Sequence, residues 1–199
     1  MKYPENLSAA SQLDVDFFGF IFYQHSKRFV GDLSQKKKDI LFHTAVQKVG
    51  VFVDEKIQEL LKTANKHKLD YVQLHGNENP AYCRTIRTAG IKVIKAFGIH
   101  GGFDFALTSD FSGVADYFLF DTKSISFGGG GKKFDWQVLD GYQGQTPFFL
   151  SGGIKPEDAA AIKLIGHPRL AGIDLNSGFE MEPGLKNIEL IKEFIANIR

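Results

Sequence analysis

The stretch Phe17–Tyr23, with the sequence FFGFIFY, is apolar at almost every position. A strand with one solvated face alternates between apolar and polar residues, whereas a strand of a parallel sheet is covered on both faces and is apolar throughout. The run Tyr117–Asp121, with the sequence YFLFD, has the same character over its first four positions. Both runs therefore predict strands of a parallel sheet.

Short apolar runs recur along the chain, and each is followed by a stretch with helical periodicity. The expected strands are Phe17–Tyr23, Lys48–Val53, Tyr71–His75, Lys92–Ile99, Tyr117–Asp121, Pro147–Ser151 and Gly172–Asn176. This alternation predicts βα units rather than an antiparallel fold. No change in composition suggests a linker, so we expect a single domain over residues 1–199.

A helix is also expected before the first strand, from Pro4 to about Leu13. The count of seven strands and eight helical segments predicts an α/β fold of the (β/α)8 TIM-barrel type that lacks its first strand in this chain. An open, doubly wound sheet is the alternative. Glycine and polar residues follow the late strands, as they do in barrel phosphate sites, and this favours the barrel.

Local signals give several helix boundaries. Asp54 is expected to cap the next helix, and Asn79-Pro80 has the pattern of an N-cap followed by proline at the first helical position. Pro156 has the same pattern. The last helix is expected from about Lys186, and residues 101–111 are interpreted as a short helix.

The composition narrows the class of partner. The chain has 24 basic and 23 acidic side chains and a net charge of +1, which disfavours nucleic acid or an anionic membrane as partner. We expect no membrane span and no leader, and hence a cytoplasmic protein that acts on a small molecule. The single cysteine, Cys83, lies within an expected helix and is interpreted as a small buried apolar group; no metal site is expected.

Candidate site residues lie where strands end, because parallel α/β folds place their sites there. Arg28 follows the first run and could hold a carboxylate with its planar fork, or it could be a solvated surface charge. His75 could be an acid–base group or a hydrogen-bonded structural histidine. Asp121 could serve as a general acid or as a turn cap.

Three glycine-rich segments also follow strands. Gly128, Gly129, Gly130, Gly131 and Lys132 do not have the spacing of a nucleotide-binding P-loop, and we interpret them as a mobile loop over substrate or as a plain flexible loop. Ser151-Gly152-Gly153 and Asn176-Ser177-Gly178 expose backbone N–H groups on the last two strands. Together they predict a phosphate site.

The ordered set of these motifs resembles the phosphoribosylanthranilate isomerases of tryptophan biosynthesis. The matching segments include GFIFY with SKR at 19–28, VQLHG at 72–76, LFDT at 119–122, GKKFDW at 131–136, LSGG at 150–153 and DLNSGFE at 174–180. The resemblance extends from Pro4 onward.

The resemblance implies a barrel without a cofactor that converts N-(5-phosphoribosyl)anthranilate into 1-(2-carboxyphenylamino)-1-deoxy-D-ribulose 5-phosphate by an Amadori rearrangement. It makes Asp121 the general acid and places Arg28 at the anthranilate carboxylate, with His75 also contacting substrate. It makes Gly152, Gly153, Asn176, Ser177 and Gly178 the phosphate cradle, under the loop Gly128–Lys132. A phosphosugar partner and a monomer or homodimer are expected.

One feature departs from the family pattern. The general base is a cysteine in a Lys-Xaa-Cys-Gly motif that ends the first strand, and its spacing places it about two positions ahead of Met1. Cys83 does not match it. We therefore expect an N-terminally truncated chain that is inactive or impaired. The two strands that would flank the missing strand, Phe17–Tyr23 and Gly172–Asn176, are expected to leave a gap, to pair directly with each other or to exchange strands with another molecule. Another phosphosugar barrel enzyme, such as an indole-glycerol-phosphate synthase or a phosphopentose epimerase, and a non-catalytic phosphosugar-binding relative are the alternatives.

Overall fold

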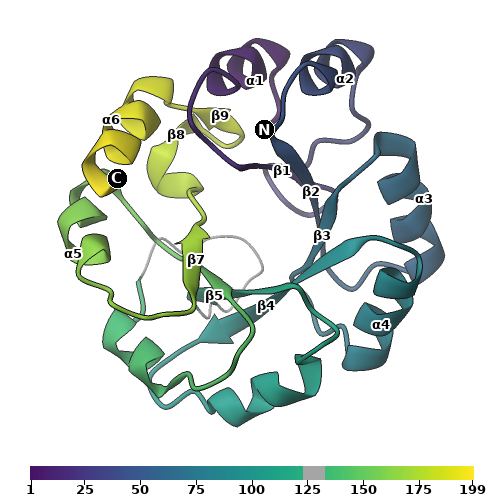
Figure 1. Cartoon of the computed structure of the whole chain (residues 1–199). Coiled ribbons are helices and arrows are strands. Elements are labelled where there is room, and N and C mark those ends of the chain that lie inside the picture. Colours follow the sequence, from purple (N-terminus) through teal and green to yellow (C-terminus); the bar gives the residue numbers. More distant parts are fainter. Residues whose placement is uncertain (123–132) are drawn as a thin grey trace.

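A computed structural model describes residues 1–122 and 133–199. Its main feature is a seven-stranded sheet whose strands lie in the order of the sequence, with every neighbouring pair parallel (Figure 1). The strands are β1 (Phe17–Ile21), β2 (Gln47–Phe52), β3 (Tyr71–Leu74), β4 (Lys92–Ile99), β5 (Tyr117–Thr122), β6 (Phe148–Leu150) and β7 (Leu170–Ile173). All seven expected strands are confirmed, and their sequential order in a curled sheet fits the barrel rather than the doubly wound alternative.

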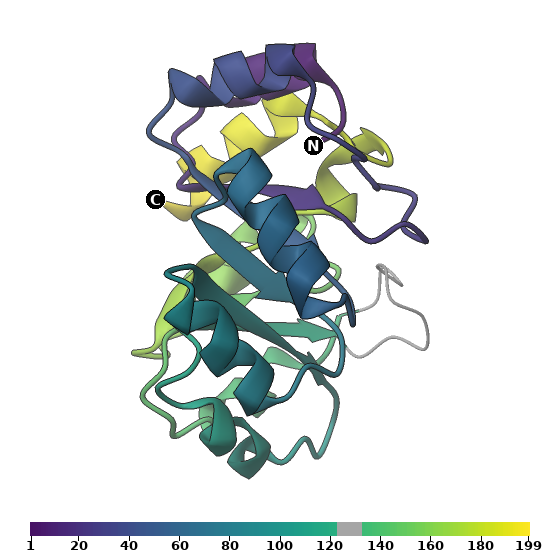
Figure 2. The same ribbon diagram turned by 90° about the vertical axis from the view of Figure 1, so that its right-hand side faces the viewer.

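The connections between strands lie outside the sheet (Figures 1 and 2). The α-helices are α1 (Pro4–Ala10), α2 (Gln35–Phe42), α3 (Ile57–His67), α4 (Pro80–Thr88), α5 (Ala159–Lys163) and α6 (Ile188–Ile198). Shorter 3-10 segments are η1 (Phe105–Phe111), η2 (Trp136–Gly141), η3 (Pro156–Asp158) and η4 (Ser177–Phe179). The connections from β4 to β5 and from β5 to β6 are thus 3-10 in their described part, where α-helices would be usual for the barrel.

Two helix starts show when a capping signal works. The Asn79 side chain accepts a hydrogen bond from the Tyr82 N–H at 2.9 Å and caps α4 as predicted. The prediction that Asp54 caps α3 was wrong, because α3 begins at Ile57 with Lys56 in the capping position. Asp54 has a positive φ of 47°, and its carboxylate accepts from the Asn77 N–H at 2.6 Å. Its side chain is therefore committed to the loop after β3.

The sheet is open at one place. Among the described residues, β1 and β7 are the edge strands and no ladder joins them, so the gapped arrangement is the one that the structure shows. A hairpin of β8 (Glu180–Glu182) and β9 (Leu185–Lys186), which the sequence pattern did not predict, packs beside the start of the chain. Asn6 exchanges two hydrogen bonds of 2.8 Å with the Lys186 backbone.

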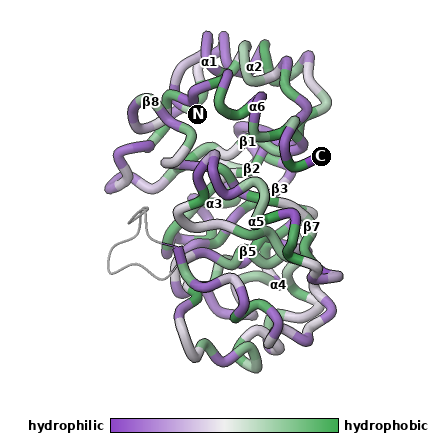
Figure 3. Tube along the Cα trace, turned by 90° about the vertical axis from the view of Figure 1, so that its left-hand side faces the viewer, coloured by the Kyte–Doolittle hydropathy of each residue, from purple (hydrophilic) through white to green (hydrophobic). Residues whose placement is uncertain are grey.

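The core has two layers, one on each face of the sheet. The interior of the barrel is filled by inward-facing side chains, namely Val49, Tyr71, Ile94, Ala96, Leu119 and Phe149, with Phe17 and Tyr117 packed against them. A larger layer lies between the sheet and the helices. Hydrophobic segments accordingly run through the middle of the molecule in Figure 3. Successive strand residues face opposite layers, so the inward positions can be followed along each strand to its end.

Candidate functional site

The inward-facing rows of three strands end in polar side chains at the carboxyl end of the barrel. His75 lies four positions beyond the inward-facing Tyr71 on β3, and Asp121 lies two beyond Leu119 on β5. Because side chains alternate with a period of two, both reach the same mouth of the barrel. The His75 Nε2 atom lies 3.3 Å from Asp121 Oδ2. The structure thus brings together two residues that the sequence placed at separate strand ends.

His75 is held from its other ring nitrogen as well. Gln73, two positions earlier on the same face of β3, places its Nε2 atom 2.9 Å from His75 Nδ1. The Gln73 amide thus contacts the ring at Nδ1, while Nε2 faces Asp121. Asp121 also accepts at Oδ1 from the Thr122 N–H, at 2.8 Å. The orientation of the imidazole relative to the carboxylate is therefore fixed at both ends.

Asp174 is a third member of this mouth, and the sequence analysis gave it no role. It follows β7 directly, and its Oδ2 atom accepts from Ser151 Oγ at 3.0 Å. Burial raises the pKa of the Asp174 carboxyl; Asp121 raises it further, while Lys186 opposes the shift. The rule that selected Asp121, a carboxylate directly after an apolar strand, could also have selected Asp174.

Arg28 is tied to a carboxylate of its own chain, and only 15% of its side chain is exposed. Its Nε lies 3.0 and 2.8 Å from the two carboxylate oxygens of Glu180, and its Nη2 lies 2.6 Å from Oε2. The interpretation of Arg28 as a solvated surface charge is therefore wrong. The planar fork is held in the bidentate geometry that guanidinium groups make with carboxylates.

Glu180 and Lys186 were also missed by the sequence analysis. Lys186 Nζ lies 3.1 Å from Glu180 Oε1 and donates to the carbonyls of Leu175 and Asn176, both at 3.1 Å. Although burial opposes ionisation of Glu180, Arg28 and Lys186 hold the pKa of its carboxyl below the usual value. Burial lowers the pKa of the Lys186 ammonium. These contacts depend on the hairpin of β8 and β9, whose Pro183-Gly184 turn is a local signal that the sequence analysis did not use.

The two predicted glycine turns lie against each other beside Asp121. Gly152 and Gly153 have φ angles of +93° and +66°, a region that favours glycine. A Cβ atom at Gly152 would overlap Thr122, and one at Gly178 would overlap the carbonyl oxygen of Ile154. The loop after β6 therefore approaches the end of β5 because Gly152 has no side chain, and the loop after β7 approaches the loop after β6 because Gly178 has none.

The helix that follows the first of these turns is shorter than expected. A 3-10 turn, η3, precedes the five-residue α5, so a helix dipole contributes little here. The Asp158 carboxylate accepts from the Lys155 N–H at 2.8 Å and lies 2.5 Å from Lys133 Nζ. Any anion at this turn would be held mainly by backbone N–H groups of the loops.

Several other predictions concern residues away from this mouth. Gly128, Gly129, Gly130, Gly131 and Lys132 lie outside the described residues. Cys83 is fully buried on α4, as predicted, and burial raises the pKa of its thiol to about 11. It is therefore a protonated thiol between helix and sheet, and it does not reach the mouth.

Residues 1–122 and 133–199 contain no cluster of three or more His, Cys, Asp or Glu side chains arranged to hold a metal ion. None of their helices is long and apolar enough to cross a bilayer.

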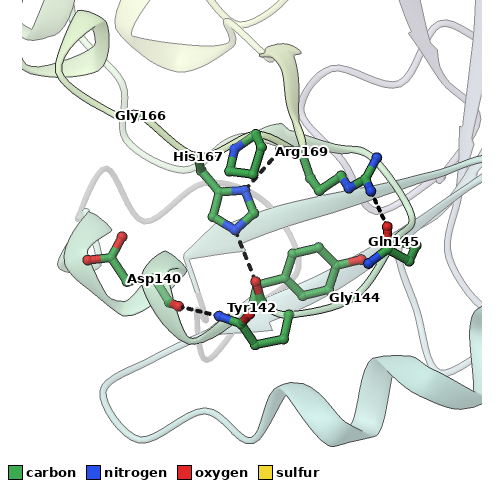
Figure 4. A pocket seen from close by; sticks show the side chains of 9 residues that line it. Asp140, Tyr142, Gly144, Gln145, Gly166, His167 and Arg169 are labelled. Atoms are coloured by element: carbon green, nitrogen blue, oxygen red, sulfur yellow. Dashed lines mark hydrogen bonds between the residues drawn. The ribbon is translucent and has the colours of Figure 1, made fainter.

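A hollow of about 470 Å³ lies at the opposite end of the barrel, where loops lead into β6 and β7 (Figure 4). Its polar groups are paired with one another. His167 Nε2 lies 3.0 Å from the Tyr142 carbonyl oxygen, its Nδ1 accepts from the Arg169 N–H at 3.1 Å, and the Arg169 guanidinium contacts Gln145. Asp140 and His167 both line this hollow, but His167 is hydrogen-bonded to backbone groups, whereas His75 at the mouth faces a carboxylate. The mouth is therefore the candidate active site.

The family is decided by comparison with known proteins. The model of the family described as N-(5'-phosphoribosyl)anthranilate (PRA) isomerase matches residues 1–197. The chain belongs to this isomerase family. A curated N-(5'-phosphoribosyl)anthranilate isomerase from Parabacteroides distasonis is 50% identical over 199 residues, which cover all of this chain and 90% of the relative.

Solved structures of the isomerase family agree with the fold. A phosphoribosyl anthranilate isomerase from Thermus thermophilus matches with a TM-score of 0.85 and 26% identity, covering all of this chain and 94% of that one. A second isomerase structure, a complex with reduced 1-(o-carboxyphenylamino)-1-deoxyribulose 5-phosphate, matches with a TM-score of 0.76 and 30% identity, covering 100% and 94% of the two chains. The resemblance drawn from the sequence motifs, including the barrel fold, is thereby confirmed.

Proposed function

We propose that the mouth of this barrel converts N-(5-phosphoribosyl)anthranilate into 1-(2-carboxyphenylamino)-1-deoxy-D-ribulose 5-phosphate, as a cytoplasmic enzyme of tryptophan biosynthesis. Membership of the isomerase family supports the reaction. The observation that carries the assignment to this site is the contact of 3.3 Å between His75 and Asp121, beside two glycine turns at the ends of neighbouring strands.

The reaction requires an acid and a base on one substrate. Asp121, in its protonated form, donates a proton to the ribose ring oxygen, the C1–O bond breaks, and the anilino nitrogen lone pair forms a C1=N Schiff base. A base then removes the proton from C2 and leaves an enolamine. Protonation of this enolamine at C1, with loss of the C2 hydroxyl proton, gives the ketone of the product. The hydrogen moves within the substrate skeleton, so the balance of the reaction calls for no redox cofactor.

Asp121 is suited to the acid step because its carboxylate is directed by partners on two sides. Oδ2 faces His75 and Oδ1 accepts from the Thr122 N–H. We assign His75 to the placement of Asp121 and to contact with substrate. The family resemblance assigns the base to a cysteine of a Lys-Xaa-Cys-Gly motif. Cys83 does not fill that role, because its buried thiol has a pKa of about 11 and faces the helical layer.

Substrate binding is divided between the two ends of the ligand. We assign the anthranilate carboxylate to Arg28, whose guanidinium Glu180 already holds in a fixed plane. We assign the phosphate to the turns of Gly152, Gly153, Asn176, Ser177 and Gly178, which approach each other closely where Gly178 lies against the Ile154 carbonyl oxygen. Lys186 fixes the second turn through the Asn176 carbonyl and side-chain oxygens, both at 3.1 Å.

The Asp121→Asn variant tests the proposal. In a chain to which a Lys-Xaa-Cys-Gly segment has been joined ahead of Met1, the turnover of this variant should fall about 10²–10⁴-fold, the usual contribution of a general acid, because the amide cannot protonate the ring oxygen. Binding of the reduced product analogue, measured by calorimetry, should change less than about threefold, because carboxylate and phosphate contacts lie elsewhere. The exposed Asp110 on η1 gives a matched control, and Asp110→Asn should change neither quantity.

Two outcomes would contradict the assignment. Turnover of Asp121→Asn within a few-fold of the parent would remove Asp121 from the acid step. Tight binding of the analogue without turnover, in a chain that carries the cysteine segment, would favour the non-catalytic phosphosugar-binding alternative.

A further inference from the structure

A buried ion pair lies behind His75, on the outer face of the sheet. Lys95 of β4 and Glu78 of the loop after β3 place Nζ and Oε2 3.0 Å apart, and their side chains are only 4% and 2% exposed. Lys95 faces outward because its neighbours Ile94 and Ala96 face the barrel interior. Neither charged group is part of the mouth described above.

Each proton of the Lys95 ammonium has an acceptor, and two of the acceptors flank His75. Besides Glu78, Nζ donates to the carbonyl oxygens of Leu74 at 3.2 Å and Gly76 at 2.7 Å. These are the residues immediately before and after His75. Lys95 therefore holds the backbone of His75 from both sides, while the imidazole projects through to the opposite face.

The Glu78 carboxylate fixes the same segment by accepting hydrogen bonds from backbone N–H groups. Its Oε2 accepts from the Gly76 N–H at 3.0 Å, and its Oε1 accepts from the Asp54 N–H at 2.9 Å. The carboxylate thus joins the loop after β3 to the loop after β2, while Lys95 joins it to β4. Gly76, the residue after His75, is therefore held at both its N–H and its C=O.

Stability alone is a weak explanation for this pair. Two charges taken out of water lose hydration, and apolar residues of similar size often stabilise a fold equally well. Apolar replacements could not, however, supply the three directed contacts to the peptides around His75. Those contacts fix a short segment whose side chain must meet Asp121 at 3.3 Å.

We propose that Lys95 and Glu78 are positioning residues for the isomerase site, which set the backbone at His75 so that its imidazole meets Asp121. The proposal rests on the proposed function only for the catalytic consequence. The structural part concerns the His75 ring and can be tested without turnover.

Two variants and one control test it. Lys95→Met keeps the length of the side chain and removes the ammonium, and Glu78→Gln keeps an acceptor oxygen and removes the charge. The control is Lys48→Met, which breaks the 2.7 Å contact between Lys48 and Asp70 at the other end of the neighbouring strands β2 and β3. If Lys95→Met does not fold, Glu78→Gln carries the test.

The first measurement is the nitrogen-15 spectrum of the His75 imidazole in the folded full chain. Both variants should move the His75 ring signals, because the ring loses its fixed contacts with Gln73 and Asp121. Lys48→Met should leave those signals in place. Unchanged His75 signals in folded Lys95→Met or folded Glu78→Gln would overturn the proposal.

The second measurement separates positioning from general destabilisation. Lys95→Met, or Glu78→Gln in its place, should weaken binding of the reduced product analogue about tenfold in the parent chain, as coupled residues of one network do. In a His75→Ala background the same substitution should change binding less than about twofold. Equal losses in both backgrounds would overturn the proposal, whereas failure of the parent chain to bind the analogue would contradict the proposed function and leave the spectral test standing.

Discussion

The two ends of the barrel are built on opposite principles. The floor, defined by Phe17, Tyr71, Tyr117 and Phe149, is closed by aromatic rings, with the centroids of Tyr117 and Phe149 4.7 Å apart and those of Phe17 and Phe149 5.3 Å apart. The mouth, defined by His75, Asp121, Ser151 and Asp174, is lined by polar side chains. The same inward-facing rows supply both, so the chemistry changes completely within a few residues along each strand.

Polar groups at the floor satisfy the backbone. Asp70 precedes β3 and accepts from the Lys48 N–H of the neighbouring strand at 2.8 Å; Asp116 precedes β5 and accepts from the Val93 N–H at 2.8 Å. At the mouth, burial raises the pKa of the Asp174 carboxyl, and the neighbouring Asp121 carboxylate raises it further. The comparison indicates that the floor stabilises the fold, whereas the mouth keeps charges together that oppose folding.

The largest effect should come from adding the cysteine motif of the family to the mouth. Joining a Lys-Xaa-Cys-Gly segment ahead of Met1 should raise isomerase turnover about 10²–10⁴-fold over the 199-residue chain, because the thiolate supplies the base for the C2 proton. The same segment with alanine for cysteine is the matched control and should add no turnover. Equal activity of the 199-residue chain and the cysteine-bearing chain would show that another group is the base.

The floor should respond in stability rather than in binding. Phe149→Ala should lower the free energy of unfolding by about 3–5 kcal/mol, because a buried ring is lost from contact with Phe17 and Tyr117. Denaturant unfolding measures this loss. Below the unfolding transition, affinity for the reduced product analogue should stay within about threefold, and a larger loss would break the division between the two ends.

Arg28 should affect one end of the ligand only. Arg28→Lys keeps the charge and loses the fork, so affinity for the product analogue should fall about tenfold, equivalent to roughly 1.4 kcal/mol. An analogue without the aromatic carboxylate should bind both proteins alike. Arg87→Lys, on the outer helix α4, is the matched control. An equal loss for both analogues would indicate that Arg28 acts on the fold and not on the carboxylate.

The smallest expected effect is the pH dependence of folding stability that Asp174 causes at the mouth. Because burial raises the pKa of Asp174 in the folded protein, the folded state binds the proton more tightly than the unfolded chain does, and stability falls as pH rises through that pKa. Asp174→Asn should therefore stabilise the fold at pH 7 by about 0.5–2 kcal/mol, and the gain should disappear near pH 4. A gain that is independent of pH would assign the effect to packing.

The sequence predicted the fold well because the strands are apolar on both faces. Runs such as Phe17–Tyr23 contain the decisive information locally, and their order determines the sheet. Asp121 and His75 could be selected because strand ends are also visible locally. Their mutual contact required the additional inference that inward-facing rows converge, and Asp174 follows from that same inference.

Other features depend on contacts between distant parts of the chain. The partner of Arg28 is Glu180, 152 positions away, in a hairpin whose Pro183-Gly184 turn is visible in the sequence but whose contact with Arg28 is not. The ion pair of Lys95 and Glu78 was not predicted, because neither a lysine inside a strand nor a glutamate in a loop indicates by itself that it has a buried partner. The prediction for Asp54 failed for a related reason. Its carboxylate accepts a hydrogen bond from the Asn77 N–H, in the loop after the neighbouring strand, and does not cap its own helix.

The contact between Asn6 and the Lys186 backbone has a consequence for how the molecule assembles. The parallel strands from β1 to β7 pair with neighbours along the chain, but this contact joins residues 180 positions apart. The entropy of closing a loop grows with its length, so neighbouring βα units can form before the two ends of the chain meet. The junction of α1 with the β8–β9 hairpin is then a late step in folding, and local opening there would expose the Arg28 side of the mouth while the rest of the sheet stays intact.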